Sequence, residues 1–141
     1  MGGKFLFKFG SYGNGNGQFS NPHGVTVDQR GNQVVVVDQG NHRIQVFDEK
    51  GRFIRAFGSS GSGDGQLSYP RDVVVDSQGN CVVADGDNNR VSVFDSNGQF
   101  LRKFGSKGQL SSPRGIGLMS NGNVVVGEYI NSRISIFDSQ G

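Results

Sequence analysis

The chain has 141 residues, of which 24 are glycine and 11 phenylalanine, whereas alanine, leucine, methionine and glutamate together supply only 11. The scarcity of strong helix formers excludes a helical protein, and Ile, Val, Leu and Phe, which make up more than a quarter of the chain, exclude a disordered one. The net charge of +2 at pH 7 permits an anionic partner without requiring one.

Neither a membrane-spanning nor a secretory segment is predicted. No apolar run approaches the roughly 20 residues that span a bilayer, and the sequence shows no layout of a secretory signal. The single cysteine, Cys81, cannot form an internal disulfide, so nothing marks an oxidising compartment. We therefore expect a soluble, cytoplasmic protein of one domain, residues 1–141, without membrane association.

In chain order, the first predicted strand covers residues 3–10. Its sequence, Gly-Lys-Phe-Leu-Phe-Lys-Phe-Gly, returns in similar form at residues 51–58 as Gly-Arg-Phe-Ile-Arg-Ala-Phe-Gly. Short runs rich in Val, Ile and Phe lie between the two, bounded by Gly, Asn and Asp turns, and predict further strands. In the first unit these predicted strands cover residues 24–28, 33–38, 43–48 and 52–58.

The same pattern of strands recurs twice. The second unit predicts strands at residues 72–76, 81–85, 90–95 and 99–105. The third unit predicts strands at residues 115–119, 124–128 and 133–138, with no fourth strand. Residues 3–10 therefore have the sequence of the fourth strand that the third unit lacks.

Four strands per unit, at a period of about 47 residues, are typical of β-propeller blades. A sheet of this size buries too little surface to fold alone, so each blade must cover its neighbour. We predict an all-β half-propeller with blades at residues 22–58, 70–105 and 113–141, the last of them without its own fourth strand.

The repeated motif resembles the NHL repeat. The first unit carries Pro-x-Gly-Val-x-Val-Asp, Gly-Asn, Val-x-Asp, Asn-x-Arg-Ile-x-Val-Phe-Asp and Gly-x-Phe-x-x-x-Phe-Gly, and Asn41-His42-Arg43 comes close to the tripeptide that names the family. The third unit departs from the motif at residues 116–119 and at Glu128. The resemblance covers nearly the whole chain. It implies a propeller of six blades, as in cytoplasmic tripartite-motif proteins, bacterial sensor ectodomains and an amidating lyase.

Three blades cannot close a ring, because a propeller needs at least about four. The amino-terminal strand begins, and the third unit stops, in the same turn between the third and fourth strands of a blade. We expect a head-to-tail homodimer of six blades, in which residues 3–10 of each chain complete the last blade of the other. The alternative is a fragment of a larger propeller that is unstable by itself.

The loops around the central channel are where propeller partners usually bind. In this chain they carry cations, histidines and aromatic groups, and the resemblance implies an RNA-binding face like that of tripartite-motif NHL proteins, in which cations meet phosphates and rings stack on bases. The candidate residues are His23, Arg71, Arg114, Lys107, Tyr12, Tyr69, His42, Asn88 and Tyr129. The acids Asp64, Asp72 and Asp87 offset part of the positive charge, and solvated loops without a ligand are the alternative.

An acid and an arginine recur at a separation of five residues across the turn between the second and third strands. We interpret these pairs as structural, each a bidentate ion pair that holds its turn. They are Asp38 with Arg43, Asp85 with Arg90, and Glu128 with Arg133. By the same periodicity, Asn41, Asn88 and Asn131 are expected to form hydrogen bonds in the turns.

Enzymatic chemistry finds little support in the sequence. A catalytic zinc site takes three protein ligands, and the chain offers only His23, His42 and Cys81 beside its carboxylates, with nothing that clusters them. The glycine-rich residues 13–17 precede no helix, so they lack the amide groups that bind phosphate at a helix start. We predict no enzyme, no cofactor and no metal.

We interpret the chain as a non-catalytic binding module for single-stranded RNA in post-transcriptional regulation. A protein-protein interaction scaffold that uses the same loops is the main alternative. A third reading is an engineered half-propeller, built to assemble with itself and without a native function. RNA binding would weaken with salt, whereas a flat salt dependence would favour a protein partner.

Overall fold

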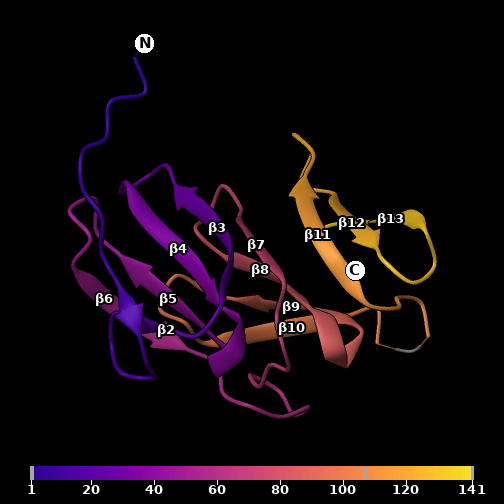
Figure 1. Ribbon diagram of the computed structural model, residues 1–141. Helices are drawn as coiled ribbons and strands as arrows, with labels where there is room; N and C mark the ends of the chain where they lie inside the picture. Colours follow the sequence, from indigo (N-terminus) through magenta and orange to yellow (C-terminus); the bar gives the residue numbers. More distant parts are fainter. Residues whose placement is uncertain (1, 107, 141) are drawn as a thin grey trace.

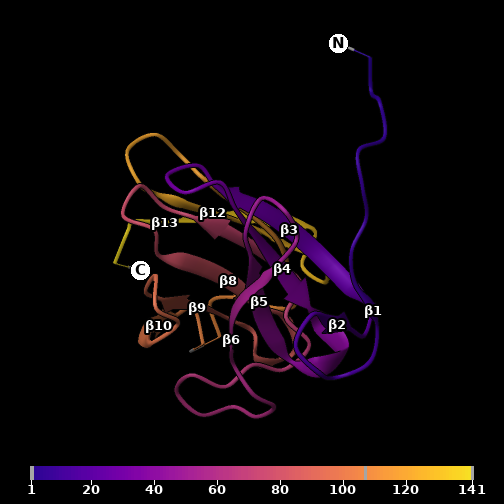
Figure 2. The ribbon, with the colours of Figure 1, turned by 90° about the vertical axis from the view of Figure 1, so that its left-hand side faces the viewer.

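The computed structural model describes residues 2–106 and 108–140, and its strands form successive antiparallel sheets (Figures 1 and 2). Blade 1 consists of β3 Pro22–Asp28, β4 Gln33–Asp38, β5 Arg43–Phe47 and β6 Phe53–Phe57. Blade 2 consists of β7 Asp72–Val75, β8 Cys81–Asp85, β9 Arg90–Phe94 and β10 Phe100–Phe104. Blade 3 consists of β11 Pro113–Leu118, β12 Val124–Glu128 and β13 Arg133–Phe137.

Each blade is a meander, in which every strand pairs with its neighbour in the sequence. The strands predicted between residues 24 and 138 are all present, and their ends differ from the predicted ones by at most two residues. Short 3₁₀ turns join the second and third strands of the first two blades, η1 Gln39–Asn41 and η2 Gly86–Asn88. The residue after each turn, His42 or Asn89, has a positive φ that closes it.

In the single chain, the amino-terminal segment does not form the strand that the sequence predicts. Residues 3–10, all of which the structure describes, form no strand; they run beside blade 1, and their amino-terminal end leads away from the sheets (Figure 1). A strand needs an edge to pair with, and Phe9 lies instead on the face of blade 1, its ring centroid 5.0 Å from that of Phe47. Two short parallel strands that were not predicted follow it, β1 Ser11–Tyr12 and β2 Gln18–Phe19.

The hydrophobic core lies between blades. One buried cluster joins β4 and β5 of blade 1 to β7, β8 and β9 of blade 2, and a second joins blade 2 to blade 3. Rings reinforce both contacts, because Phe57 packs on Phe94 at 4.9 Å and Phe104 packs on Phe137 at 5.2 Å. Each fully buried Val or Ile in these layers stabilises the fold by roughly 1.5–3 kcal/mol, so the blades depend on one another.

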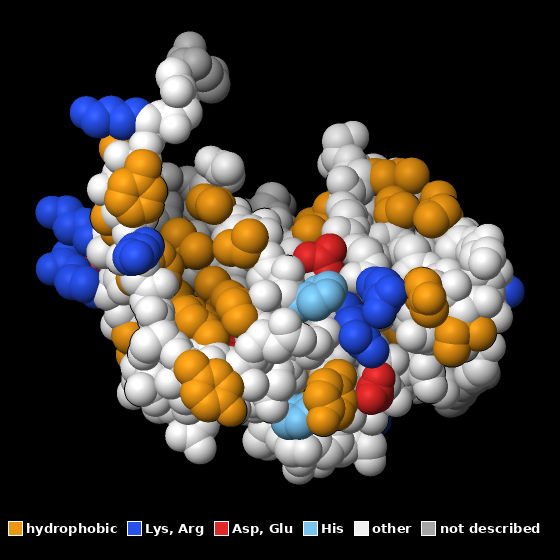
Figure 3. Space-filling view, in the orientation of Figure 1, with side chains coloured by type: hydrophobic (Ala, Val, Ile, Leu, Met, Phe, Trp, Pro, Cys, Tyr) orange, Lys and Arg blue, Asp and Glu red, His pale blue; other side chains and the backbone are white. Residues whose placement is uncertain are grey.

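The two outer faces of the three-blade stack are left open. Val25 in β3 is 65% exposed, whereas Val73, its counterpart in β7, is 1% exposed. Ile134 in β13 is 66% exposed, whereas its counterpart Val91 in β9 is fully buried. Figure 3 shows hydrophobic side chains gathered at both ends of the molecule. Burial therefore follows the presence of a neighbouring blade and not the residue type.

Among residues 2–106 and 108–140, no helix has the length and apolar character needed to cross a membrane.

Candidate functional site

The candidate loop face consists of the residues around the starts of β3, β7 and β11 together with the turns between the second and third strands of each blade. It displays histidines and cationic side chains close together, beside acidic ones (Figure 3). The residue before each proline, Asn21, Tyr69 or Ser112, has a φ between 48° and 58°. This left-handed backbone turns the incoming loop into the first strand of each blade.

The acid-arginine pairs form at the turns, in a different geometry from the predicted one. The Nε atom of Arg43 donates to Asp38 at 2.7 Å, while its Nη2 atom donates to the carbonyl oxygens of Gly15 and Gln18 at 2.8 and 3.0 Å. The prediction of a bidentate ion pair is therefore wrong. One edge of the guanidinium binds the acid, and the other fixes the loop that precedes the blade.

The other two blades repeat this arrangement. In blade 2, Arg90 Nε lies 3.0 Å from Asp85, and the Nη groups donate to the carbonyl oxygens of Ser62, Gly63 and Gln66 at 2.8 to 2.9 Å. In blade 3, Arg133 Nε lies 2.7 Å from Glu128 and its Nη2 atom donates to the carbonyl oxygen of Gln109. The bonds from the Nη groups to carbonyl oxygens join segments more than 20 residues apart, which explains why spacing in the sequence could not show them.

The turn asparagines take part in the same networks. The Nδ2 group of Asn88 donates to Asp85 at 2.9 Å and to the carbonyl oxygen of Gly61 at 2.8 Å. Asn41 makes the equivalent pair of bonds in blade 1, and Asn131 donates to Glu128 at 3.0 Å. The amide nitrogen of Asn88, a candidate for ligand contact, is thus used within the turn.

Hydrogen bonds between blades were missed by the sequence analysis. The Nδ1 atom of His42 accepts a hydrogen bond from the backbone N–H of Tyr69 at 3.0 Å, and the two rings meet edge to face at 4.4 Å. At the next junction, Asn89 Oδ1 accepts from the N–H of Ser112 at 2.8 Å. The shared signal is a polar residue directly before the turn arginine. His42 therefore joins blades 1 and 2.

His23 and Arg71 also lie at the junction of blades 1 and 2. The Nδ1 atom of His23 lies 2.9 Å from the carbonyl oxygen of Arg71, so the imidazole donates there. The guanidinium of Arg71 pairs with Asp87 at 3.3 Å, and the aspartate is half exposed. An ion pair with a half-exposed carboxylate contributes little to stability, and the Arg71 side chain itself is 20% exposed.

Arg114 and Tyr129 come together on blade 3. The guanidinium carbon of Arg114 lies 4.3 Å from the centre of the Tyr129 ring, a cation-π contact, and the ring is exposed. Both residues were expected on the loop face, but their contact was not. The result is an exposed, partly aromatic and positively charged surface on blade 3.

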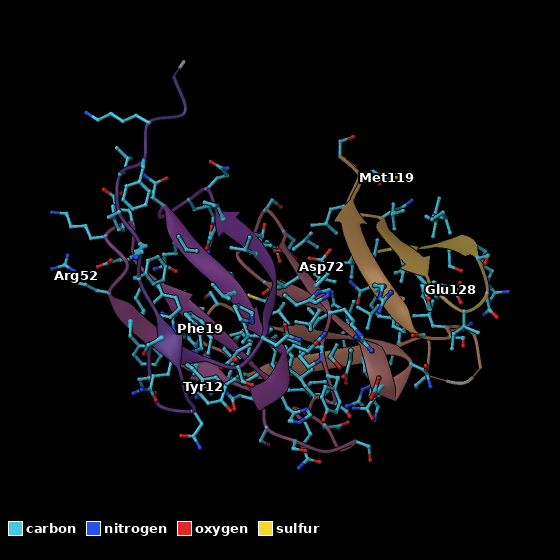
Figure 4. All side chains as sticks on the ribbon, viewed as in Figure 1. Tyr12, Phe19, Arg52, Asp72, Met119 and Glu128 are labelled. Atoms are coloured by element: carbon cyan, nitrogen blue, oxygen red, sulfur yellow. The ribbon has the colours of Figure 1, made fainter. Side chains whose placement is uncertain are left out.

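The remaining candidates are more scattered. Tyr12 is highly exposed in β1, and Lys107 lies outside the described residues. Asp72 accepts hydrogen bonds from the N–H groups of Val73 and Ile116, so its carboxylate serves the junction of blades 2 and 3. Asp64 pairs with Lys103 at 2.9 Å. Figure 4 shows Tyr12 and Asp72 apart from each other on this side of the molecule.

Two buried acids of the turns differ in their electrostatics. Hydrogen bonds, above all from Arg133, lower the pKa of Glu128 to about 2, although burial opposes the shift. At Asp85 burial outweighs its hydrogen bonds and raises the pKa. The surroundings of Glu128 therefore stabilise its charged form, whereas burial destabilises the charged form of Asp85.

The low pKa of Glu128 predicts an acid-sensitive stability. Because this pKa is about 2 in the folded chain and 4.5 in the reference state, its stabilising contribution is complete above pH 4.5 and is lost as the pH falls toward 2. We expect Glu128→Gln to be less stable than the parent chain at pH 7 and to lose less stability between pH 4.5 and 2, measured by urea unfolding. Glu49→Gln changes the other glutamate of the chain, which is exposed. This variant should show the same dependence of stability on pH as the parent chain. An unchanged slope in Glu128→Gln would contradict the assignment.

Metal and thiol chemistry have no evident site in the described part of the chain. Among residues 2–106 and 108–140, no group of three or more His, Cys, Asp and Glu side chains is placed to hold a metal ion. Burial in β8 raises the pKa of the Cys81 thiol to about 12, which keeps the sulfur protonated.

Comparison with known proteins places these repeats in a family. A family model described as the NHL repeat matches residues 19–47 and 67–94, which contain β3 to β5 and β7 to β9. The first two of the three units are therefore NHL repeats. The matched segments include the acid, asparagine and arginine of the turns in blades 1 and 2, so these residues belong to the repeated part of the motif.

Curated relatives share short stretches with the NHL-repeat chain. It is 54% identical over 44 residues to the B-box type zinc finger protein ncl-1 of Caenorhabditis elegans, over 31% of this chain and 5% of the relative. It is 46% identical over 46 residues to Protein lin-41 of the same organism, over 33% of this chain and 4% of the relative. It is 50% identical over 44 residues to Protein brain tumor of Drosophila melanogaster, over 31% and 4%. The NHL-repeat chain thus spans no more than 5% of these relatives.

Solved structures with the same fold are β-propellers. A streptogramin B lyase aligns with a TM-score of 0.65 and 19% identity, over 85% of the NHL-repeat chain and 41% of the lyase chain. A putative exported protein of Bacteroides fragilis aligns with a TM-score of 0.67 and 21% identity, over 86% and 35%. At these identities the likeness concerns the fold, and it identifies the sheets as propeller blades.

Proposed function

We propose that the NHL-repeat chain is a non-catalytic binding module whose loop face binds single-stranded RNA in post-transcriptional regulation. The observation that carries the proposal is the contact of Arg114 with the exposed ring of Tyr129. A planar cation over an aromatic ring offers a stacking surface for a base and a charge for the adjoining phosphate. The resemblance to tripartite-motif NHL domains supports an RNA ligand and a cytoplasmic setting.

The rest of the loop face fits the same ligand. Arg71 lies on blade 2 with a weakly held partner, Asp87, that a phosphate can replace. The Tyr69 ring is partly exposed beside it, held by its edge contact with His42. A strand of RNA that crosses from blade 3 to blade 2 would therefore meet a cation and a ring on each blade.

Removal of the Tyr129 ring tests this proposal. We expect Tyr129→Ala to weaken the binding of a fluorescein-labelled random single-stranded RNA about tenfold, because one base-stacking contact contributes roughly 1–3 kcal/mol. Tyr129→Phe keeps the ring and should bind as the parent chain does. Fluorescence anisotropy with increasing RNA measures both variants. Equal losses in the two variants, or no loss in either, would contradict a stacking role.

The charge of Arg114 gives a second readout of the same site. For single strands the slope of log affinity against log salt is about −0.7 per neutralised phosphate, so Arg114→Ala should reduce the slope by about that amount. Arg52→Ala is the matched control, since Arg52 is an exposed arginine between β5 and β6, far from Glu128 and blade 3 in Figure 4. A binding constant that does not change with salt in the parent chain would exclude RNA.

A protein-interaction scaffold is the second candidate function. The observation that favours it is the exposed aliphatic side chain of Ile130, next to Tyr129. Such a side chain suits contact with a protein better than contact with a nucleic acid. Retention of no RNA at low salt would favour this candidate.

We also propose that a second copy of the chain completes the binding module to a ring of six blades. The support is the pair of open apolar faces on blades 1 and 3, each of which matches a face that is buried between blades within the chain. In such a ring every loop-face residue occurs twice, so two equivalent RNA sites are expected.

A further inference from the structure

We propose that residues 5–9 of one copy pair, as an antiparallel strand, with the free edge of β13 in a second copy. Within the described residues, blades 1 and 2 have four strands and blade 3 has three. The outer edge of β13 therefore presents unpaired backbone groups, and Ile134 and Ile136 beside it are exposed. This inference adds strand exchange to the proposed two-copy ring, on which it rests.

The amino-terminal segment already occupies the position of a fourth strand that belongs to a preceding blade. Phe57, at the end of β6, packs on Phe94 of the next blade at 4.9 Å, and Phe104, at the end of β10, packs on Phe137 at 5.2 Å. Phe9 packs on Phe47 of blade 1 in the same way, at 5.0 Å. The segment is thus placed against blade 1 while the edge it should pair with is missing.

The turn glycines confirm that the placement is equivalent. A Cβ atom added to Gly98 would lie 2.7 Å from the ring of Phe57, and one added to Gly51 would lie 2.7 Å from the ring of Phe9. Both glycines have a positive φ, and both pack against the last phenylalanine of a fourth strand. Meanwhile Phe5 and Leu6 are each more than 70% exposed. The segment is therefore packed on blade 1 at Phe9 and exposed at Phe5 and Leu6, as expected for a strand without a partner strand.

The pairing of fourth on third strands in blades 1 and 2 sets the register of the exchanged strand. In blade 1 the pairs are Ile44 with Phe57, Gln45 with Ala56, and Val46 with Arg55. In blade 2 they are Val91 with Phe104, Ser92 with Lys103, and Val93 with Arg102. Transfer of this register to β13 pairs Ile134 with Phe9, Ser135 with Lys8, and Ile136 with Phe7 of the second copy.

The same placement buries the open faces. The face of β13 that carries Ile134 would meet Val25 of the second copy, as the face of Val91 meets Ile116, the counterpart of Val25 in blade 3. The hydrogen bond from Ser112 N–H to Asn89 would recur between Asn21 N–H and the Ser132 side chain. Both of these residues have the positive φ of their counterparts. Burial, backbone pairing and the polar contact therefore agree on one arrangement.

We take a second copy as the partner, because residues 2–106 and 108–140 of one chain hold the segment and the edge of β13 apart. Figures 1 and 2 show the amino-terminal segment and β13 at opposite ends of the three-blade stack. The blades between them are joined by two buried clusters, which prevent the ends from meeting without loss of the core. Two copies placed head to tail bring each segment to the edge of the other chain.

Cysteine cross-linking tests the register. Two single variants, Lys8→Cys and Ser135→Cys, are mixed, unfolded, refolded together and oxidised; Cys81 stays, because it is buried. We expect a disulfide-linked product of twice 15.1 kDa that contains both variants. The matched control, Lys4→Cys mixed with Ser135→Cys, is four residues out of register and should give at least tenfold less of it. Equal yields from the two mixtures would overturn the register.

The mass of the parent chain, measured by light scattering, separates the outcomes. A dimer that also cross-links in register supports strand exchange. A dimer that does not cross-link overturns strand exchange and leaves the two-copy ring standing. A monomer of 15.1 kDa at all concentrations overturns both. RNA affinity is measured separately, so failure of the RNA proposal is distinguishable from each of these results.

Discussion

Arg90→Ala is expected to lower the free energy of unfolding by about 3–5 kcal/mol, the cost of removing one member of a buried ion pair. Arg90 is 3% exposed and Asp85 is fully buried, so the variant leaves an uncompensated charge in the core. It also frees the carbonyl oxygens of residues 62, 63 and 66 in the preceding loop. Urea unfolding followed by circular dichroism measures the loss.

Arg52→Ala is the matched control for this variant. Arg52 pairs with Asp48 at 2.8 Å, but its side chain is 74% exposed, so the loss should be about 0–1 kcal/mol. Arg90→Ala combined with Asp85→Asn should recover part of the stability, because burial disfavours the charge of Asp85 once its partner is gone. If Arg90→Ala cost no more than Arg52→Ala, the turn network would not be a source of stability. RNA affinity at a temperature where the variant is folded should stay close to that of the parent.

Phe94→Ala is the second change with a large expected effect, a loss of about 3–5 kcal/mol. Phe94 is 1% exposed in β9 and packs on Phe57 at 4.9 Å and on Phe100 at 6.0 Å. Its removal opens a cavity in the cluster that joins blades 1 and 2, so the contact between the two blades is weakened. Loss of cooperativity should accompany the loss of stability, visible as a broader urea transition.

Phe94→Leu provides the comparison for the cavity. A leucine fills most of the same volume, and hydrophobic exchanges that conserve volume usually cost less than about 1.5 kcal/mol. If leucine and alanine destabilised the chain equally, the ring contact with Phe57 and not the filled volume would determine the stability of this junction.

The turns show how far local sequence reaches. The spacing of five residues correctly brought Asp85 and Arg90 together, because a tight turn between paired strands places them side by side. The same spacing could not show that the guanidinium also binds the loop before the blade. Those carbonyl groups lie 24 to 28 residues earlier in the chain, and only the packed blade brings them within 3 Å.

The candidate site shows a similar division. Its residues were placed on one set of loops by the repeat alone, but their contacts were not. The hydrogen bond of His42 to Tyr69 and the packing of Arg114 on Tyr129 depend on how one blade or turn rests on another. Three of the predicted ligand residues, His23, His42 and Asn88, have side-chain atoms that are used in hydrogen bonds within the fold.

The amino-acid sequence by itself determined where the strands and turns of the three blades lie, because alternation and turn residues act over a few neighbours and the pattern occurs three times. Only the tertiary structure decided which strands are buried. Val91 and Ile134 occupy the same place in the repeat, yet one is fully buried and the other 66% exposed. The physical reason is that burial belongs to the contact between blades, and an apolar side chain loses water only where another blade lies against it.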